Sequence, residues 1–225
     1  MKTPLIPFFL ALASLGLVAC SQSDEPAAPE PVVTEAMTQE PAETAAEPTP
    51  AESVNPLLAD SPYPHDYPPF DQIENEHFKP AMEQGMEEHL AEVDAIASNP
   101  EPPTFENTIT EMEKAGQTLQ YVMRVFGARV GAHTNDELQA IQREMSPRLA
   151  AHSDAISLNP ELFSRIQTLY NERESLDLDA ESLRLLERYH RNFVRAGAQL
   201  DDEQKEELKA INAELAELGT EFSQK

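Results

Sequence analysis

Residues 75–98 read NEHFKPAMEQGMEEHLAEVDAIAS, and their apolar side chains recur every three or four positions. Phe78, Met82 and Met86 fall on one face of an α-helix, and Leu90 and Val93 continue that face. The pattern predicts an amphipathic helix that buries one side. The proline-rich segment that follows ends this helix, because proline lacks an N–H donor and restricts the residue before it.

The same periodicity continues to the end of the chain, and no stretch alternates with the period of a β-strand. Asn75 is the expected N-cap of the first helix. Five further helices are expected to begin at Thr104, Asn135, Asn159, Asp179 and Asp201. The second should continue through Phe126 and weaken near Gly127, and the third should kink at Pro147. Short connectors then predict an all-α fold, an antiparallel multi-helix array.

The last expected helix keeps its apolar spacing up to the final residues of the chain. Its apolar positions are Leu208, Ile211, Leu215, Leu218 and Phe222. No Gly, Asn or Pro stop signal follows before Lys225. We therefore expect the chain to be the front part of a longer arrangement, with apolar helix faces exposed where the remainder would pack.

Residues 1–19 have the features of a bacterial secretion signal. A basic Lys2 precedes an apolar run over residues 4–15 that is too short to span a bilayer. Small and branched residues stand directly before Cys20, as in a lipobox. We expect a lipoprotein signal peptide (1–19), lipid attachment at Cys20, and an outer-membrane anchor facing the periplasm, because Ser21 is not the Asp that favours inner-membrane retention. An incidental cysteine after an ordinary signal peptide is the alternative.

Cys20 is the only cysteine in the 225 residues. The chain therefore has no intramolecular disulfide and no CxxC metal or redox site. From the lipidated Cys20 to residue 60 the sequence is rich in Pro, Glu and Ala and contains no Lys or Arg. Such a segment buries too little apolar surface to fold, so residues 20–60 are expected to form a disordered tether.

The formal net charge is −25. Nucleic acid is therefore excluded as a partner, because phosphate binding requires clustered Lys and Arg. The 165 residues from 61 to 225 are sufficient for one helical region with its own core.

No complete catalytic motif occurs in the sequence. A nucleophile elbow, a phosphate-binding glycine loop and an H-E-x-x-H zinc motif are all missing, and no His is directly followed by Glu. Glu-x-x-His appears twice, at Glu74–His77 and at Glu187–His190. Two such pairs on facing helices can hold two iron or manganese ions, so a carboxylate metal centre is one hypothesis. Surface or capping roles for these residues are the other.

The remaining polar candidates have structural explanations as well as functional ones. His152 and His190 lie on or beside apolar faces, which favours core histidines bonded to a neighbour. Five arginines could face a groove or form solvated faces with carboxylates four residues away, and these are Arg124, Arg129, Arg188, Arg191 and Arg195. No residue is assigned as catalytic, cofactor-binding or metal-binding.

Several segments together carry a resemblance to a known family. Asn55-Pro56-Leu57-Leu58, Pro69-Phe70-Asp71-Gln72-Ile73 and His77-Phe78-Lys79-Pro80-Ala81 resemble the opening of the M3 zinc metallopeptidases. The match to that family continues through residues 95–100 and 104–109. Residues 132–139, 158–163, 173–176 and 193–198 are similar to its peptidyl-dipeptidase (Dcp-like, dipeptidyl carboxypeptidase) branch. The resemblance runs in order from residue 55 to residue 225.

This resemblance implies a fold and an activity for the complete family enzyme. Two helical halves form a clamshell around a channel, and residues 61–225 resemble the N-terminal helical region of the non-catalytic half. A zinc-bound water cleaves oligopeptides and releases their C-terminal dipeptides. The zinc ligands lie in a later H-E-x-x-H region, which no position in this chain matches.

Two functional hypotheses follow. In the first, this chain is the N-terminal portion of a zinc-dependent oligopeptidase and is inactive without its catalytic half. In the second, it is a non-catalytic helical envelope lipoprotein that binds peptides or a protein partner.

Overall fold

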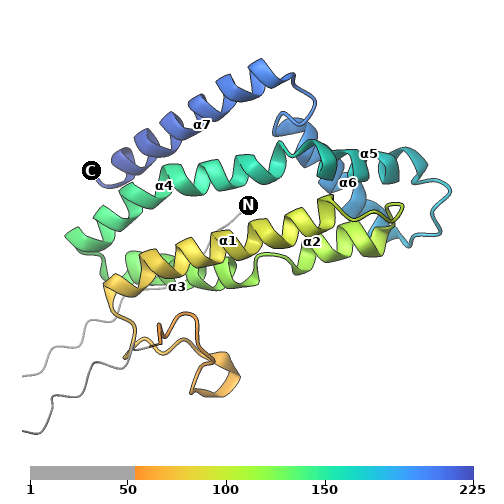
Figure 1. Cartoon of the computed structure of the whole chain (residues 1–225). Helices are drawn as coiled ribbons and strands as arrows, with labels where there is room; N and C mark the ends of the chain where they lie inside the picture. Colours follow the sequence, from red (N-terminus) through yellow and green to blue (C-terminus); the bar gives the residue numbers. More distant parts are fainter. Residues whose placement is uncertain (1–53) are drawn as a thin grey trace, which may run out of the picture. The chain divides into compact units, whose positions relative to one another are not determined.

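The computed structural model describes residues 54–225, which contain helices and connecting segments but no β-strand (Figure 1). The longer helices are α1 (Phe78–Ala97), α3 (Gln117–His133), α4 (Asp136–Ser157), α5 (Pro160–Glu172), α6 (Ala180–Arg195) and α7 (Asp202–Ser223). The shorter ones are η1 (Pro64–Asp66), η2 (Asn75–His77), η3 (Phe105–Thr110) and α2 (Glu111–Lys114). The predicted all-α class is confirmed. The predicted signal peptide, Cys20 and the tether up to residue 53 lie outside the described residues.

Helix α1 contributes to two apolar clusters. Its N-terminal half places Phe78 and Met82 in a cluster shared with α3 and α4. Its C-terminal half places Val93 and Ile96 in a second cluster with α5 and α6. The face predicted from residues 75–98 is therefore buried, and one helix joins both parts of the core.

The folded region begins before residue 61, the predicted boundary between the tether and the helical region. Leu57 is 2% exposed and belongs to the first cluster. Asn55 holds this segment in place, because its side-chain amide donates to the carbonyl of His77 at 2.8 Å and its Oδ1 accepts from the N–H of Leu57 at 3.0 Å. Residues at the end of the predicted tether thus contribute to the core.

The long helices α1, α3 and α4 alternate in direction along the chain. Phe78 packs on Phe126 and Gly85 approaches Leu119, so α1 and α3 run antiparallel. Helices α1 and α4 run parallel, since contacts join Lys79 to Glu144 and, further along both helices, His89 to His152. This parallel pair agrees with the predicted antiparallel array, in which every second helix points the same way. The reason is topological: α1 and α4 are two helices apart in the chain, with α3 reversing direction between them.

The second predicted helix is interrupted. Thr104 caps as expected, accepting from the N–H of Asn107 at 3.0 Å, but η3 and α2 follow and α3 starts afresh after Gly116. Gly116 has φ 74°, a left-handed conformation that favours glycine. Its N–H donates to Glu92 at 2.6 Å, so α1 holds the break in place. The weakening expected near Gly127 is not seen, because α3 continues to His133.

Most predicted N-caps are confirmed. The side chains that accept a helix N–H are those of Asn135, Asn159, Asp179 and Asp201. Asn75 is not an N-cap, since the capping box at this end joins Glu74 and His77. The Asn75 amide instead donates to Glu137 of α4 at 2.8 Å. Helix α4 runs through Pro147 without interruption.

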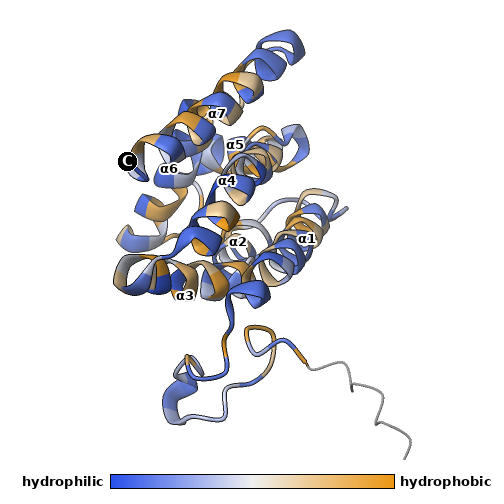
Figure 2. Cartoon of the chain, turned by 90° about the vertical axis from the view of Figure 1, so that its left-hand side faces the viewer, coloured by the Kyte–Doolittle hydropathy of each residue, from blue (hydrophilic) through white to orange (hydrophobic). Residues whose placement is uncertain are grey.

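Helix α7 lies antiparallel to α4 but presents its apolar residues outward. The N-terminal Lys205 reaches the carbonyl of Leu158, and Gln224 near the other end reaches the carbonyl of Gln139. Figure 2 shows apolar segments along α7 in orange. Ile211, Leu215, Leu218 and Phe222 are exposed. The expected exposed apolar face is therefore present on α7. Within residues 54–225, no helix combines the length and apolarity needed to cross a bilayer.

Candidate functional site

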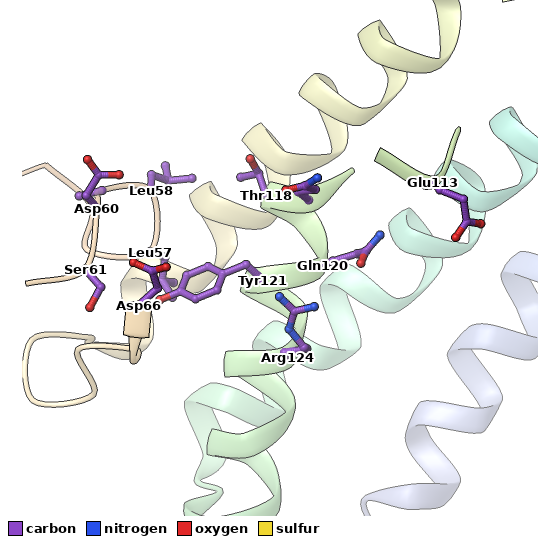
Figure 3. A pocket seen from close by; sticks show the side chains of 12 residues that line it. Leu57, Leu58, Asp60, Ser61, Asp66, Glu113, Thr118, Gln120, Tyr121 and Arg124 are labelled. Carbon is purple, nitrogen blue, oxygen red and sulfur yellow. The ribbon is translucent and has the colours of Figure 1, made fainter. Parts of the chain in front are cut away.

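A polar groove of about 600 Å³ lies between the segment before α1 and one side of α3. The segment contributes Leu57 to Ser61 and Asp66. The helices contribute Glu113, Gln117, Thr118, Gln120, Tyr121 and Arg124. Figure 3 shows the ring of Tyr121 reaching from α3 toward the segment that carries Asp66. Of the five predicted arginines, only Arg124 lines this groove.

The wall opposite α3 is shaped by unusual backbone geometry. His65 and Asp66 have φ values of 62° and 53°, in the left-handed region that residues other than glycine rarely adopt. Ser61 Oγ donates to the carbonyl of Tyr67 at 2.5 Å and accepts from the N–H of Tyr63 at 3.1 Å. These bonds fold the segment into a compact turn and place Asp66 opposite Tyr121.

The groove contains charges of both signs. Burial raises the pKa of Tyr121, Asp66 raises it further, and Arg124 opposes the change. Tyr121 therefore keeps its phenolic proton at neutral pH. At the other end, Glu113 accepts a hydrogen bond from Tyr189 of α6 at 2.6 Å, and burial raises the pKa of that tyrosine. A carboxylate-rich groove with one guanidinium suits hydrogen bonding to a peptide.

The lining of this groove includes no His, Cys or Lys side chain. In the part of the chain that the structure describes, no group of three or more His, Cys, Asp or Glu side chains could hold a metal ion. Zinc, which the family resemblance implies, therefore does not fit the described residues.

A histidine pair connects α1 and α4 between the two apolar clusters. His89 Nδ1 and His152 Nε2 lie 3.0 Å apart, and the pair is partly buried. Burial lowers the pKa of each histidine; the neighbouring His89 lowers that of His152 further, while Glu92 opposes the shift at His89. The neutral forms are favoured, and one ring donates to the other. The prediction of a core histidine bonded to a neighbour is confirmed for His152.

Arg165 is the buried charge that sequence analysis missed. The residue is 8% exposed, and its guanidinium donates to the carbonyls of Asn99 and Glu101 at 2.9 and 3.0 Å. It also donates to Asn107 Oδ1 at 2.8 Å and to Thr108 Oγ1 at 3.3 Å. Arg165 thus anchors the proline-rich connection between α1 and η3. The available signal was its place between two buried positions of α5, where a charge requires buried partners.

The two Glu-x-x-His patterns have structural roles. Glu74 and His77 form the capping box of η2, with the N–H of Glu74 donating to His77 Nδ1 at 2.9 Å. His190 contacts Gln167 at 3.0 Å and stacks on Tyr170 with ring centroids 3.7 Å apart. The two patterns are not brought together as a metal-binding group among residues 54–225.

The predicted carboxylate pairing of the five arginines is wrong. No ion pair within 4.0 Å joins any of them to a carboxylate in the described region. Arg129 instead donates to the carbonyl of Ile73. Arg191 and Arg195 line a second cavity of about 480 Å³ beside Tyr170 and His190. Arg124, Arg188, Arg191 and Arg195 are exposed, so the expected solvated position is confirmed for these four, without the expected carboxylate partners.

Comparison with known proteins places these helices among peptidases. The chain is 46% identical to a dipeptidyl carboxypeptidase of Escherichia coli over 173 residues, which is 77% of this chain and 25% of that protein. It is 44% identical to the dipeptidyl carboxypeptidase of Salmonella typhimurium over the same length, with the same shares. An organellar oligopeptidase A of Arabidopsis thaliana is 26% identical over 172 residues, 76% of this chain and 21% of that protein. No family model matches the sequence.

These similarities show that the matched stretch belongs to the M3 peptidase family. Within that family it is more similar to the two dipeptidyl carboxypeptidases than to the oligopeptidase A proteins that it matches. The matched residues cover about a quarter of the length of those two relatives.

Proposed function

We propose that this chain forms the N-terminal helical region of a zinc-dependent oligopeptidase that releases C-terminal dipeptides from oligopeptides. The observation that supports the proposal most strongly is 46% identity over 173 residues to a protein named dipeptidyl carboxypeptidase. Identity at this level over most of the folded region indicates common architecture and a shared role for these helices.

In this proposal the chain positions peptides and does not cleave them. Zinc, held by an H-E-x-x-H region outside this sequence, would supply the activated water. The residues of this chain would contribute the polar groove, where Arg124 offers a cation to a peptide carboxylate or carbonyl and Tyr121 offers a hydroxyl donor. Asp66 and Glu113 would accept from peptide N–H groups or cationic side chains. The chain alone is expected to have no peptidase activity.

The decisive experiment is to read the genomic DNA downstream of the codon for Lys225 and to express the complete reading frame. We expect an H-E-x-x-H codon pattern, in phase or after a frameshift. The complete product should contain stoichiometric zinc and release a dipeptide from a blocked tripeptide. A downstream region without that pattern would refute the proposal.

We further propose that the protein is lipid-anchored through Cys20 and lies in the outer membrane facing the periplasm. The support is the signal-like stretch before Cys20 and the Ser at position 21. Radiolabelled palmitate should be incorporated into the wild-type chain and not into the Cys20→Ser variant. Recovery of unlabelled wild-type protein from the soluble fraction would contradict the anchor.

The alternative is a non-catalytic envelope lipoprotein that binds peptides, and the groove beside Tyr121 favours this second candidate. Both candidates predict that the purified chain binds oligopeptides without hydrolysing them, so the downstream reading frame separates the two. Binding without hydrolysis, together with no catalytic region downstream, would support the binding protein.

A further inference from the structure

The outward face of α7 has the spacing of a coiled-coil seam. Leu208, Ile211, Leu215, Leu218 and Phe222 follow one another at alternating intervals of three and four residues. The last four, which we call the α7 stripe, are 46, 61, 53 and 81% exposed in chain order. Apolar side chains aligned in this way form a contiguous surface that water solvates poorly.

The orientation of the stripe is determined by polar contacts on the opposite side of α7. Asn212 Nδ2 donates to Asp154 Oδ1 of α4 at 2.8 Å. Thr220 Oγ1 donates to Ser146 Oγ at 2.7 Å, and Ser146 Oγ donates to the carbonyl of Ala216 at 3.0 Å. Turning the stripe toward α4 would break these bonds and leave Asp154, which is 6% exposed, without its partner.

A row of carboxylates accompanies the stripe along one side. Glu207, Glu214 and Glu221 recur every seven residues and are all exposed. In residues 54–225 no Lys or Arg lies within 4.0 Å of these three side chains as an ion-pair partner. In a seam of this kind, charges beside the apolar residues select the partner helix by complementarity.

A second copy of this chain is a poor occupant. Each copy carries a net charge of −25, and α7 itself holds seven acidic residues against two lysines, so two copies would bring like charges together. The complementary occupant is a helix with an apolar seam and with Lys or Arg beside that seam. Such a helix covers the stripe and neutralises the carboxylates together.

We propose that the α7 stripe is the docking surface for a basic-flanked amphipathic helix from the region of a dipeptidyl carboxypeptidase outside the matched residues. The inference rests on the proposed function, because it assigns the occupant to the remainder of that enzyme. The matched stretch covers 25% of the Escherichia coli protein, so most of that protein is available to supply the helix.

The test uses the whole chain and overlapping peptides of about 25 residues that tile the unmatched part of Escherichia coli dipeptidyl carboxypeptidase. We expect one or a few amphipathic peptides with basic flanks to bind and to become helical, as measured by fluorescence polarisation and circular dichroism. Leu215→Glu and Leu218→Glu should each weaken binding by at least about tenfold. Both positions are exposed, so circular dichroism should show that the variants remain folded.

Charge variants test the flank separately. Glu214→Lys should lower the affinity of the same peptides for the chain and reduce the salt dependence of their binding. Glu174→Lys makes the same charge change in the connection between α5 and α6, where the glutamate side chain is 92% exposed, and should leave binding unchanged.

Three outcomes would overturn the inference. In the first, no tiled peptide binds at about 100 µM. In the second, binding survives Leu215→Glu or selects peptides without basic flanks. In the third, sedimentation shows a dimer that Leu215→Glu dissociates, which would make a second copy the occupant. The proposed function is tested by the downstream reading frame, and the docking surface is tested by peptide binding. Failure of one proposal can therefore be told apart from failure of the other.

Discussion

Two helix interfaces in this molecule are built in opposite ways. Helices α1 and α3 meet through apolar side chains and through Gly85, where an added Cβ would lie 2.9 Å from the backbone of Leu119. Helices α4 and α7 meet through hydrogen bonds among small and polar side chains, while the apolar side of α7 faces outward. Both α1 and α7 are amphipathic in sequence, yet only α1 buries its apolar face.

The contrast between α1 and α7 shows which part of helix packing an amphipathic sequence predicts. Periodic apolar residues predict that a helix has a face to bury, because water solvates that face poorly. They do not identify the surface that covers it. On α1 the covering surfaces are α3 and α4 at one end and α5 and α6 at the other. On α7 no described helix covers the apolar face, and the polar face determines the docking.

The largest expected effect comes from a substitution in the apolar interface between α1 and α3. Phe78 is fully buried and meets Phe126 edge to face, with ring centroids 5.1 Å apart. Phe78→Ala should lower the free energy of unfolding by about 3–5 kcal/mol, through lost burial and the cavity left behind. Urea denaturation followed by circular dichroism measures it. A loss below about 1 kcal/mol would show that α1 and α3 are not tightly packed.

Close approach of the two helices predicts the next effect. Gly85→Ala should destabilise the fold by about 1–3 kcal/mol, because the new methyl group meets the backbone of Leu119. Gly127→Ala is the matched control in α3, since nothing lies within 4 Å of its Cβ position. That control should be neutral or stabilising by up to about 1 kcal/mol, from the better helix propensity of alanine. Equal effects at both positions would argue against the close contact.

The histidine pair predicts a pH dependence at the boundary between the clusters. Folding holds the pKa values of His89 and His152 below the ordinary value of 6.5, so the unfolded chain binds more protons as pH falls. The free energy of unfolding should therefore be level above about pH 7.5 and decrease below about 6.5, by at most about 1.4 kcal/mol per pH unit for each proton. Urea midpoints between pH 5.5 and 8 measure this slope.

The pair is tested against variants that do not titrate. His152→Gln should reduce the slope relative to wild type, because one of the two paired imidazoles is gone, while His89 and His190, whose pKa values burial also lowers, keep the rest. His133→Gln, at an exposed position in the last turn of α3, is the control and should keep the wild-type slope. A slope that persists unchanged in His152→Gln would assign the pH dependence to other groups.

The smallest effect is expected on α7. Leu218 is 53% exposed, so Leu218→Ser should change the free energy of unfolding by no more than about 0.5 kcal/mol. The same class of change at buried Leu162 of α5 should cost several times as much. Chemical denaturation of both variants checks the contrast. A large loss at Leu218 would mean that the α7 stripe is covered within this chain.

Local signals predicted most element boundaries. Asn135, Asn159, Asp179 and Asp201 cap their helices as expected, because a cap is formed between residues only three positions apart. The break at Gly116 was not predicted, since it depends on Glu92 and the ring of His89 from another helix. Arg165 was missed for the same reason: its acceptors lie in a connection 57 to 66 residues away.

The candidate groove was predicted only in part. Sequence analysis selected Arg124 among several arginines, but not Tyr121, Asp66 or Glu113, which the fold brings to the same groove from separate segments. Nothing in local spacing connects these residues. The turn that positions Asp66 depends on Ser61 and on two left-handed residues, which are not typical of any strong turn motif.

The sequence by itself determined the all-α class, most of the helix caps, the buried face of α1 and the family to which the matched stretch belongs. These follow from spacing, local hydrogen bonding and residue identity, which are read directly along the chain. Only the tertiary structure decided that α1 packs against α4 as well as α3, that Arg165 is buried among carbonyls, and that α7 turns its apolar side outward. Each of these depends on contacts between segments that are distant in the chain. On α7, the hydrogen bonds to α4 determine which side of the helix docks, and the apolar side is therefore left exposed.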